Sequence, residues 1–293
     1  MPWVQLKLRI ASPLADRLEA RLSELGAVAV TMTDAEDQPL FEPPIGTTPL
    51  WDNTIITGLF PAETDGRALI EQLQARLGNT PLPDWKVEIL EDQDWTRVWM
   101  DSFKPMRFGQ HLWICPSTYT PPEPTAINIL LDPGLAFGTG THPTTAMCLT
   151  WLDAFPPTGK SVIDYGCGSG ILALAAGKLG AQSILAIDND PQALTATRSN
   201  AGQNGLSDLI ETCLPEQFTP AEVDLLLANI LAGPLHELAE RFAALVKPGG
   251  QLVLSGLLDN QAEAIIQTYR PWFDVSLYLQ QEEWICLHGK RRI

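Results

Sequence analysis

Cysteine is scarce in this sequence, and the few cysteines present form no pattern typical of a metal site or a disulfide framework. Zinc sites need closely spaced pairs such as C-x-x-C, and disulfide frameworks need an even number of cysteines in a short secreted chain. His236 and Glu237 also lack the second histidine of a zinc-binding helix. The sequence therefore predicts reduced thiols, no metal and a cytoplasmic location. The five cysteines are odd in number and widely spread, at Cys115, Cys148, Cys167, Cys213 and Cys286.

Basic residues are also few, with 19 Lys and Arg against 35 Asp and Glu and a net charge of -16. A protein that binds duplex nucleic acid is expected to carry a basic stripe for the phosphates. Because no such stripe is visible, we expect no DNA partner. An acidic surface favours a basic partner through electrostatic steering, although acidity can also serve solubility alone.

Long apolar runs are absent too. No run approaches the roughly 18 residues of a membrane span, and the first residues lack the basic and then apolar regions of a secretory signal. We therefore expect a cytoplasmic protein with no membrane association. The 293 residues suffice for about two domains, and the 45% hydrophobic content can fill their cores.

A glycine-rich turn at residues 164–170 is the most informative pattern present. An apolar strand ends at Asp164, and Gly166, Gly168 and Gly170 follow at alternate positions before an Ala-rich helix predicted over 171–179. Glycine permits a positive φ and a close approach of ligand to backbone, and the first helix amides point back at the turn. Asp164 is placed where it can hold loop amides. The pattern predicts a cofactor loop.

The spacing decides between ligands for this loop. A dinucleotide fingerprint needs Gly or Ala where Ile171 stands, which weakens a nicotinamide cofactor without excluding it. Residues 159–161, Gly-Lys-Ser, precede the strand and lack the first glycine of a phosphate loop, so they are a chance match. The next strand, 183–187, ends at Asp188, which suits ribose hydroxyls, and Asp190 is expected to cap the following helix. A tight turn without ligand is the plainer alternative.

The first ninety or so residues alternate between predicted strands and helices in the order β-α-β-β-α-β. This order is the ferredoxin-like α+β arrangement, a fold with many functions. We expect it to span residues 1–91 and to be followed by a linker helix at 92–104, with Trp95 and Trp99 on one face. The predicted strands are 3–10, 27–33, 54–60 and 85–90, and the predicted helices are 12–25 and 64–77.

Residues 105–293 are expected to form a second domain, of the α/β class, in which predicted strands and helices alternate. Before the glycine loop, strands are predicted at 107–115 and 126–131, as a hairpin, and residues 132–145 are rich in Gly and Thr. In this stretch Thr145 is expected to cap amides or face a ligand, and His142 to act in catalysis or to serve structure. Further strands are predicted at 223–228, 251–255, 273–279 and 283–287, with a helix at 259–269.

Asn229 ends the strand predicted at 223–228. Because ligands of open α/β sheets bind beyond the carboxyl ends of the strands, we expect Asn229 in the same crevice as Gly166 and Asp188. The glycine loop with Asp188 resembles that of class I S-adenosylmethionine-dependent methyltransferases. Members of that class that methylate planar amines often continue this strand end with Pro-Pro-aromatic, whereas here Ile230 and Leu231 follow. The absence of a stacking wall favours a flexible aliphatic amine over a flipped base.

The Asp-x-Gly-x-Gly-x-Gly loop with Asp188 resembles the class I S-adenosylmethionine-dependent methyltransferases. With segments 3–8, 94–103, 131–145 and 228–234, nearly the whole chain is similar to the bacterial family that methylates ribosomal protein L-eleven. For residues 105–293 the resemblance implies a seven-stranded Rossmann-like sheet that closes with the antiparallel pair 273–279 and 283–287. It also implies S-adenosylmethionine as cofactor and ribosomal protein L-eleven as a basic protein substrate. It implies trimethylation of lysine ε-amino groups and the N-terminal α-amino group, with an N-terminal domain that recognises the substrate and swings on the linker helix. The expected cofactor-binding residues are Thr145, Asp164, Gly166, Gly168, Gly170, Asp188 and Asn229.

Asn229 is also the candidate catalytic residue, expected to orient the amine, and no strong base is obvious nearby. We expect a monomeric protein-lysine N-methyltransferase. Three alternatives stay open on the residues alone: a nicotinamide-dependent oxidoreductase, a methyltransferase acting on another amine, and a non-catalytic binding module with a cofactor-sensing domain.

Overall fold

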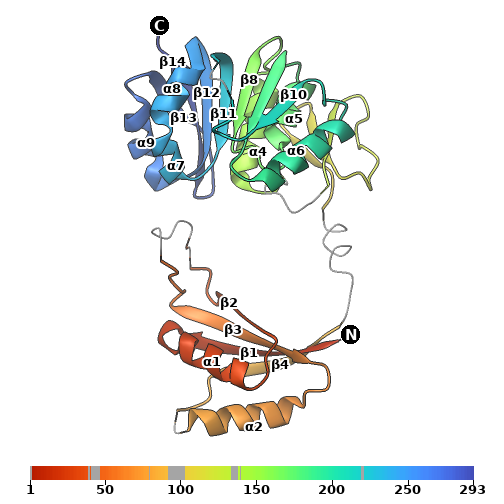
Figure 1. The fold of residues 1–293 in the computed structure, drawn as a ribbon, viewed down its shortest axis with the longest axis vertical. Helices are drawn as coiled ribbons and strands as arrows, with labels where there is room; N and C mark the ends of the chain where they lie inside the picture. Colours follow the sequence, from red (N-terminus) through yellow and green to blue (C-terminus); the bar gives the residue numbers. More distant parts are fainter. Residues whose placement is uncertain are drawn as a thin grey trace. The chain divides into compact units, whose positions relative to one another are not determined.

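The computed structural model describes residues 2–38, 40, 47–78, 80–91, 103–132, 138, 140–218 and 221–293. The chain divides into two compact units, Met1–Val98 and Trp99–Ile293, and each is described by itself (Figure 1). Most of the predicted linker helix, at residues 92–102, lies outside the described residues, as do residues 133–137 and 139 of the Gly- and Thr-rich stretch.

The N-terminal unit is an antiparallel sheet in the order β2-β3-β1-β4, with two helices on one of its faces. Alternation along the first strand places Val4, Leu6, Leu8 and Ile10 on the covered face, where they pack against leucines of both helices. The elements are β1 (Trp3–Ala11), α1 (Ala15–Glu24) after a short 3-10 turn, β2 (Ala29–Asp34), β3 (Asn53–Pro61), α2 (Gly66–Leu77) and β4 (Asp84–Leu90).

The C-terminal unit contains a seven-stranded sheet in the order β10-β9-β8-β11-β12-β14-β13. Strands β8 to β12 run parallel, and β14 is antiparallel to both of its neighbours, so the predicted α/β fold and its antiparallel closing pair are confirmed. The strands are β8 (Ser161–Tyr165), β9 (Ser183–Ile187), β10 (Ile210–Cys213), β11 (Val223–Asn229), β12 (Val246–Leu258), β13 (Phe273–Gln281) and β14 (Trp284–Arg291).

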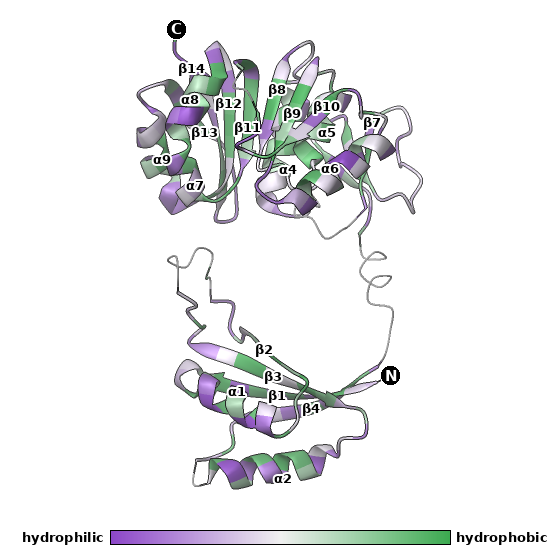
Figure 2. Ribbon diagram, in the orientation of Figure 1, coloured by the Kyte–Doolittle hydropathy of each residue, from purple (hydrophilic) through white to green (hydrophobic). Residues whose placement is uncertain are grey.

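Helices cover both faces of this sheet, and this explains why its central strands contain nearly continuous apolar runs, such as residues 225–228 of β11. The apolar colouring of β8, β11 and β12 in Figure 2 follows this burial. One core joins the sheet to α4 (Pro143–Ala154), α5 (Ile171–Lys178) and α6 (Pro191–Gln203). The other joins it to α7 (Ala232–Glu237), α8 (Ala239–Leu245) and α9 (Ala262–Tyr269).

The strand predicted over 107–115 is wrong: the segment forms two strands, β5 (Met106–Phe108) and β6 (Leu112–Cys115), that pair as a hairpin. Asp153 of α4 breaks the strand, because its carboxylate accepts hydrogen bonds from the amides of Gln110 (2.6 Å) and His111 (3.1 Å). The predicted hairpin with the next strand is wrong too, since β6 and β7 (Ile127–Leu130) are parallel.

Two further differences concern the large sheet. Strand β10 had no prediction because its sequence, Ile-Glu-Thr-Cys, is short and half polar. Strand β12 extends beyond the strand predicted at 251–255 in both directions. Within the described ranges, none of the helices combines the length and the apolar content required to cross a bilayer.

Candidate active site

The carboxyl ends of β8, β9 and β11 meet at a cavity of about 230 Å³. Six of the seven residues predicted to bind a cofactor line it, while Gly170 does not. Sequence reasoning missed Asn189 and Ile230, although each directly follows a predicted strand-end residue. The lining comprises Gly138, Thr145, Asp164, Gly166, Cys167, Gly168, Ile171, Leu172, Asp188, Asn189, Asn229 and Ile230.

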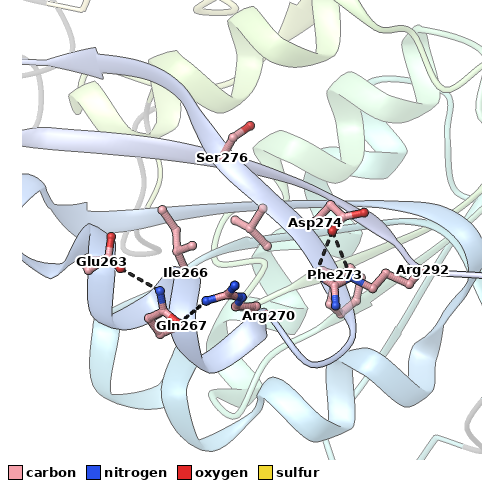
Figure 3. A pocket seen from close by; sticks show the side chains of 9 residues that line it. Glu263, Ile266, Gln267, Arg270, Phe273, Asp274, Ser276 and Arg292 are labelled. Carbon is pink, nitrogen blue, oxygen red and sulfur yellow. Dashed lines mark hydrogen bonds and ion pairs between the residues drawn. The ribbon is translucent and has the colours of Figure 1, made fainter.

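A second hollow, of about 340 Å³, lies between α9 and the edge strand β13 (Figure 3). Its polar groups are paired with one another: Arg292 forms an ion pair with Asp274 (2.8 Å), and Gln267 donates to Glu263 (2.8 Å). None of the residues predicted to bind a cofactor lines this hollow.

The glycines of the loop are required by backbone geometry and by packing. Gly166, Gly168 and Gly170 have φ values of +80°, +55° and +80°, in the left-handed region that side chains disfavour. A Cβ at Gly166 would lie closer than 3.0 Å to Ile230, and one at Gly170 equally close to Thr197. Gly170 is the N-cap residue before α5, so the structure gives it a role in the turn and in packing against α6.

Asp188 ties the glycine loop to the start of α6. Its Oδ2 accepts the amide N–H of Gly168 (2.9 Å), and its Oδ1 accepts that of Asp190 (3.0 Å). Asp190 in turn caps α6 by accepting the amide of Gln192 (2.8 Å), as predicted. The carboxylate therefore holds the loop in place and still lines the cavity.

Asp164 is buried at the floor of the cavity, with 1% of its surface exposed. Its Oδ2 accepts the amide of Ala173 (2.9 Å), so it holds the first turns of α5 and not the loop amides that were expected. Its Oδ1 is buried and has no partner among the described residues. Burial raises the pKa of this carboxyl to about 7, and the charge of Asp188 adds to the effect. An unpaired buried carboxylate oxygen beside a cavity suits a cationic ligand group such as an ammonium.

Asn229 and Thr145 meet across the cavity. Asn229 ends β11, and its Nδ2 donates to Oγ1 of Thr145 (3.1 Å), which is buried in the first turn of α4. With Nδ2 engaged, the amide is fixed in orientation. None of the described residues donates a hydrogen bond to Oδ1, so this oxygen is available to accept an N–H from a substrate.

His142 caps α4 and does not line the cavity. Its Nδ1 lies 2.7 Å from Oγ1 of Thr144, and its ring stands edge-on to Trp284 with centroids 4.8 Å apart. Burial lowers the pKa of this imidazole, which keeps it neutral near pH 7. Of the two roles considered for His142, the structure supports the structural one.

Three features define a class I S-adenosylmethionine-dependent methyltransferase: the order of the strands in the sheet, the glycine loop that follows β8, and Asp188 directly after β9. The sequence profile of the ribosomal protein L11 methyltransferase family matches residues 2–292. The chain belongs to this family, and S-adenosylmethionine is its methyl donor. Membership of this family does not favour the alternative function of a nicotinamide-dependent oxidoreductase.

Individual relatives agree with the family match. The chain is 52% identical over 292 residues to a ribosomal protein L11 methyltransferase of Nitrosococcus oceani, covering 100% of both chains. It is 53% identical over 293 residues to one of Pseudomonas aeruginosa, covering 100% of this chain and 99% of that one. A crystal structure of a ribosomal protein L11 methylase from Lactobacillus delbrueckii subsp. bulgaricus matches with a TM-score of 0.59 and 35% identity, covering 65% of this chain and 100% of that one.

Proposed function

We propose that this enzyme transfers methyl groups from S-adenosylmethionine to lysine ε-amino groups and the N-terminal α-amino group of ribosomal protein L11, up to the trimethylated state. The observation that carries the proposal is the Asn229 amide, held by Thr145 beside the glycine loop with its oxygen free to accept an amine N–H. The names of the full-length relatives support the choice of substrate.

The cavity residues fit the cofactor. Asp188 would accept hydrogen bonds from the ribose hydroxyls, and the loop from Gly166 to Gly170 would wrap the methionine and ribose parts. The unpaired oxygen of Asp164 would face the cationic part of the cofactor, where a carboxylate is favourable. When bound, S-adenosylmethionine would supply a methyl group from its positively charged sulfur, the C–S bond breaking as a neutral amine forms the new C–N bond.

The residues around the cavity favour the neutral amine that this displacement needs. A lysine with a pKa near 10.4 must be deprotonated at a cost of about 4.6 kcal/mol at pH 7. The apolar walls formed by Ile171, Leu172 and Ile230 desolvate the amine and lower its pKa. Asn229 accepts one N–H and aligns the lone pair, so proximity and orientation carry most of the rate.

Solvent takes the released proton in this mechanism. The titratable groups that line the cavity are Asp164, Cys167 and Asp188, and two of them are engaged by backbone amides. Burial raises the pKa of the Cys167 thiol far above neutral, so it stays protonated and serves as neither base nor nucleophile. The aliphatic walls leave the amine room to rotate between successive transfers.

We also propose that residues 1–91 form a ferredoxin-like recognition domain, residues 92–104 a linker helix and residues 105–293 the catalytic domain of a cytoplasmic monomer. The antiparallel order β2-β3-β1-β4 supports the first assignment. The boundary between the compact units, after residue 98, falls within the proposed linker. The net charge of -16 favours a basic protein substrate.

Methyl transfer to ribosomal protein L11 is tested by incubating it with the enzyme and S-adenosylmethionine carrying a radiolabelled methyl group. We expect label in L11, and less label in L11 variants whose lysines are replaced by arginine, which keeps the charge and removes the acceptor. The proposal fails if wild-type enzyme binds the cofactor and leaves L11 unlabelled.

Replacing Thr145 with valine is expected to lower kcat roughly three- to tenfold, because one orienting hydrogen bond of about 0.5–1.5 kcal/mol is lost. Valine keeps the shape of the side chain, and Asn229 loses the acceptor that fixes its amide. Thr145→Ser retains the hydroxyl and should retain most of the activity. Steady-state methylation rates measure both variants; a valine variant that keeps the wild-type kcat would show that the Thr145 hydroxyl does not orient Asn229 for catalysis.

A further inference from the structure

Ile230 is seated between two glycines from different strands. Gly166 follows β8 and has a φ of +80°, and Gly256 lies in β12 with a φ of +83°. A Cβ at Gly166 would come closer than 3.0 Å to Cγ2 of Ile230. A Cβ at Gly256 would also come closer than 3.0 Å to both the carbonyl O and the carbonyl C of Ile230. The side chain of Ile230 thus occupies the space left by one glycine, and its backbone the space left by the other.

The backbone around Ile230 shows how strand β11 delivers it to this position. Asn229 pairs with Ser255 in the parallel ladder, and the amide of Ile230 donates to the carbonyl of Ser255 (3.2 Å). The pairing of β12 with β14 is irregular between Leu254 and Leu257. Gly256 lies within this irregularity, so β12 makes room for the end of β11 at this level.

Ile230 therefore lies between two parts of the site. On one side it touches the cofactor loop at Gly166, and on the other it continues directly from Asn229, whose amide is held by Thr145. We propose that Ile230 is a positioning residue for methyl transfer, seated between Gly166 and Gly256 so that Asn229 keeps its place relative to the cofactor loop. The inference rests on the proposed function, since it assigns Asn229 to the amine.

The test first introduces a steric clash between residues 166 and 230 and then removes it with a second substitution. In Gly166→Ala the added methyl group collides with Cγ2 of Ile230, and we expect kcat to fall sharply while KM for L11 changes little. Ile230→Ala removes Cγ2, so the double variant Gly166→Ala/Ile230→Ala should recover roughly tenfold in kcat over the single Gly166 variant. Calorimetric affinity for S-adenosylhomocysteine, measured in parallel, should recover in the same direction.

Matched controls separate contact from backbone strain. Gly159 (φ +71°) and Gly249 (φ +79°) have the same left-handed conformation, but no described atom lies within 4 Å of a Cβ placed on either. Gly249 lies in the same strand as Gly256. We expect Gly256→Ala to lower kcat strongly, and Gly249→Ala and Gly159→Ala to lower the melting temperature but keep kcat.

Two results would overturn the proposal. If the double variant is as slow as Gly166→Ala and binds S-adenosylhomocysteine no better, the added methyl group obstructs the cofactor and not Ile230. If Gly249→Ala loses as much activity as Gly256→Ala, backbone strain explains the loss. An enzyme that leaves L11 unmodified contradicts the proposed function alone; recovery of S-adenosylhomocysteine affinity in the double variant then supports the seating of Ile230, and its absence refutes it.

Discussion

Replacing Asp188 with alanine is expected to lower kcat/KM for methyl transfer by roughly a hundredfold or more. The carboxylate holds the amides of Gly168 and Asp190 and lines the cavity where the ribose hydroxyls would bind. Hydrogen bonds to a charged group contribute about 1.5–3 kcal/mol each, so two bonds to the cofactor account for a loss of this size. Loosening of the loop at Gly168 adds to it.

Asp190→Ala is the matched control, because Asp190 is two residues away, exposed, and caps α6 without lining the cavity. We expect this variant to lose about 1 kcal/mol of unfolding free energy and to keep its kcat/KM. Steady-state methylation and denaturant unfolding measure the pair. If both variants lose activity equally, the start of α6 matters as a whole and the ribose assignment of Asp188 is wrong.

Replacing Asp164 with asparagine is expected to stabilise the ligand-free protein near pH 8. The carboxyl has a pKa of about 7 in the folded state, raised by burial, against about 3.9 in the unfolded chain. Because the folded value is the higher one, the neutral acid contributes stability that is complete below pH 4 and is lost as pH rises to 7. Between pH 5 and pH 7, wild type should lose about 1.4 kcal/mol of unfolding free energy per pH unit relative to the asparagine variant.

The same substitution is expected to weaken cofactor binding. The unpaired oxygen of Asp164 favours a cation only when the carboxyl is ionised, so wild-type affinity for S-adenosylmethionine should increase as pH rises through 7. The asparagine variant should bind more weakly and without this rise. Urea unfolding and calorimetric titration across pH 5 to 8 measure the two effects. Parallel curves for wild type and variant would show that Asp164 does not titrate in this range.

The strand ends of the site could be predicted from the sequence because topology alone brings them together. Asp188 and Asn229 end parallel strands, and the carboxyl ends of such strands share one edge of the sheet. The direction of the Asp164 side chain could not be predicted, since position in a motif does not say which amide a carboxylate meets. The seat of Ile230 also escaped prediction, because it depends on Gly256, which lies far along the chain in another strand.

The errors in the fold have a similar cause. The break between β5 and β6 depends on Asp153, a residue of α4 distant in sequence, so local alternation predicted one continuous strand. Among the described strands, β10 pairs with β9 alone at the edge of the sheet, and its polar residues give no apolar run. Hydrophobic periodicity and turn residues indicate the local preference of a segment for helix, strand or turn. The features that were mispredicted depend on contacts between distant segments.

The intact mass of ribosomal protein L11 after incubation with enzyme and S-adenosylmethionine tests the central claim most directly, because the shift counts methyl groups and identifies the acceptor protein together. We predict a series of masses separated by single methyl groups that ends at fully trimethylated amines, and a much smaller shift with Asn229→Ala. An L11 mass that stays unchanged in the presence of folded, cofactor-binding enzyme would contradict the assignment.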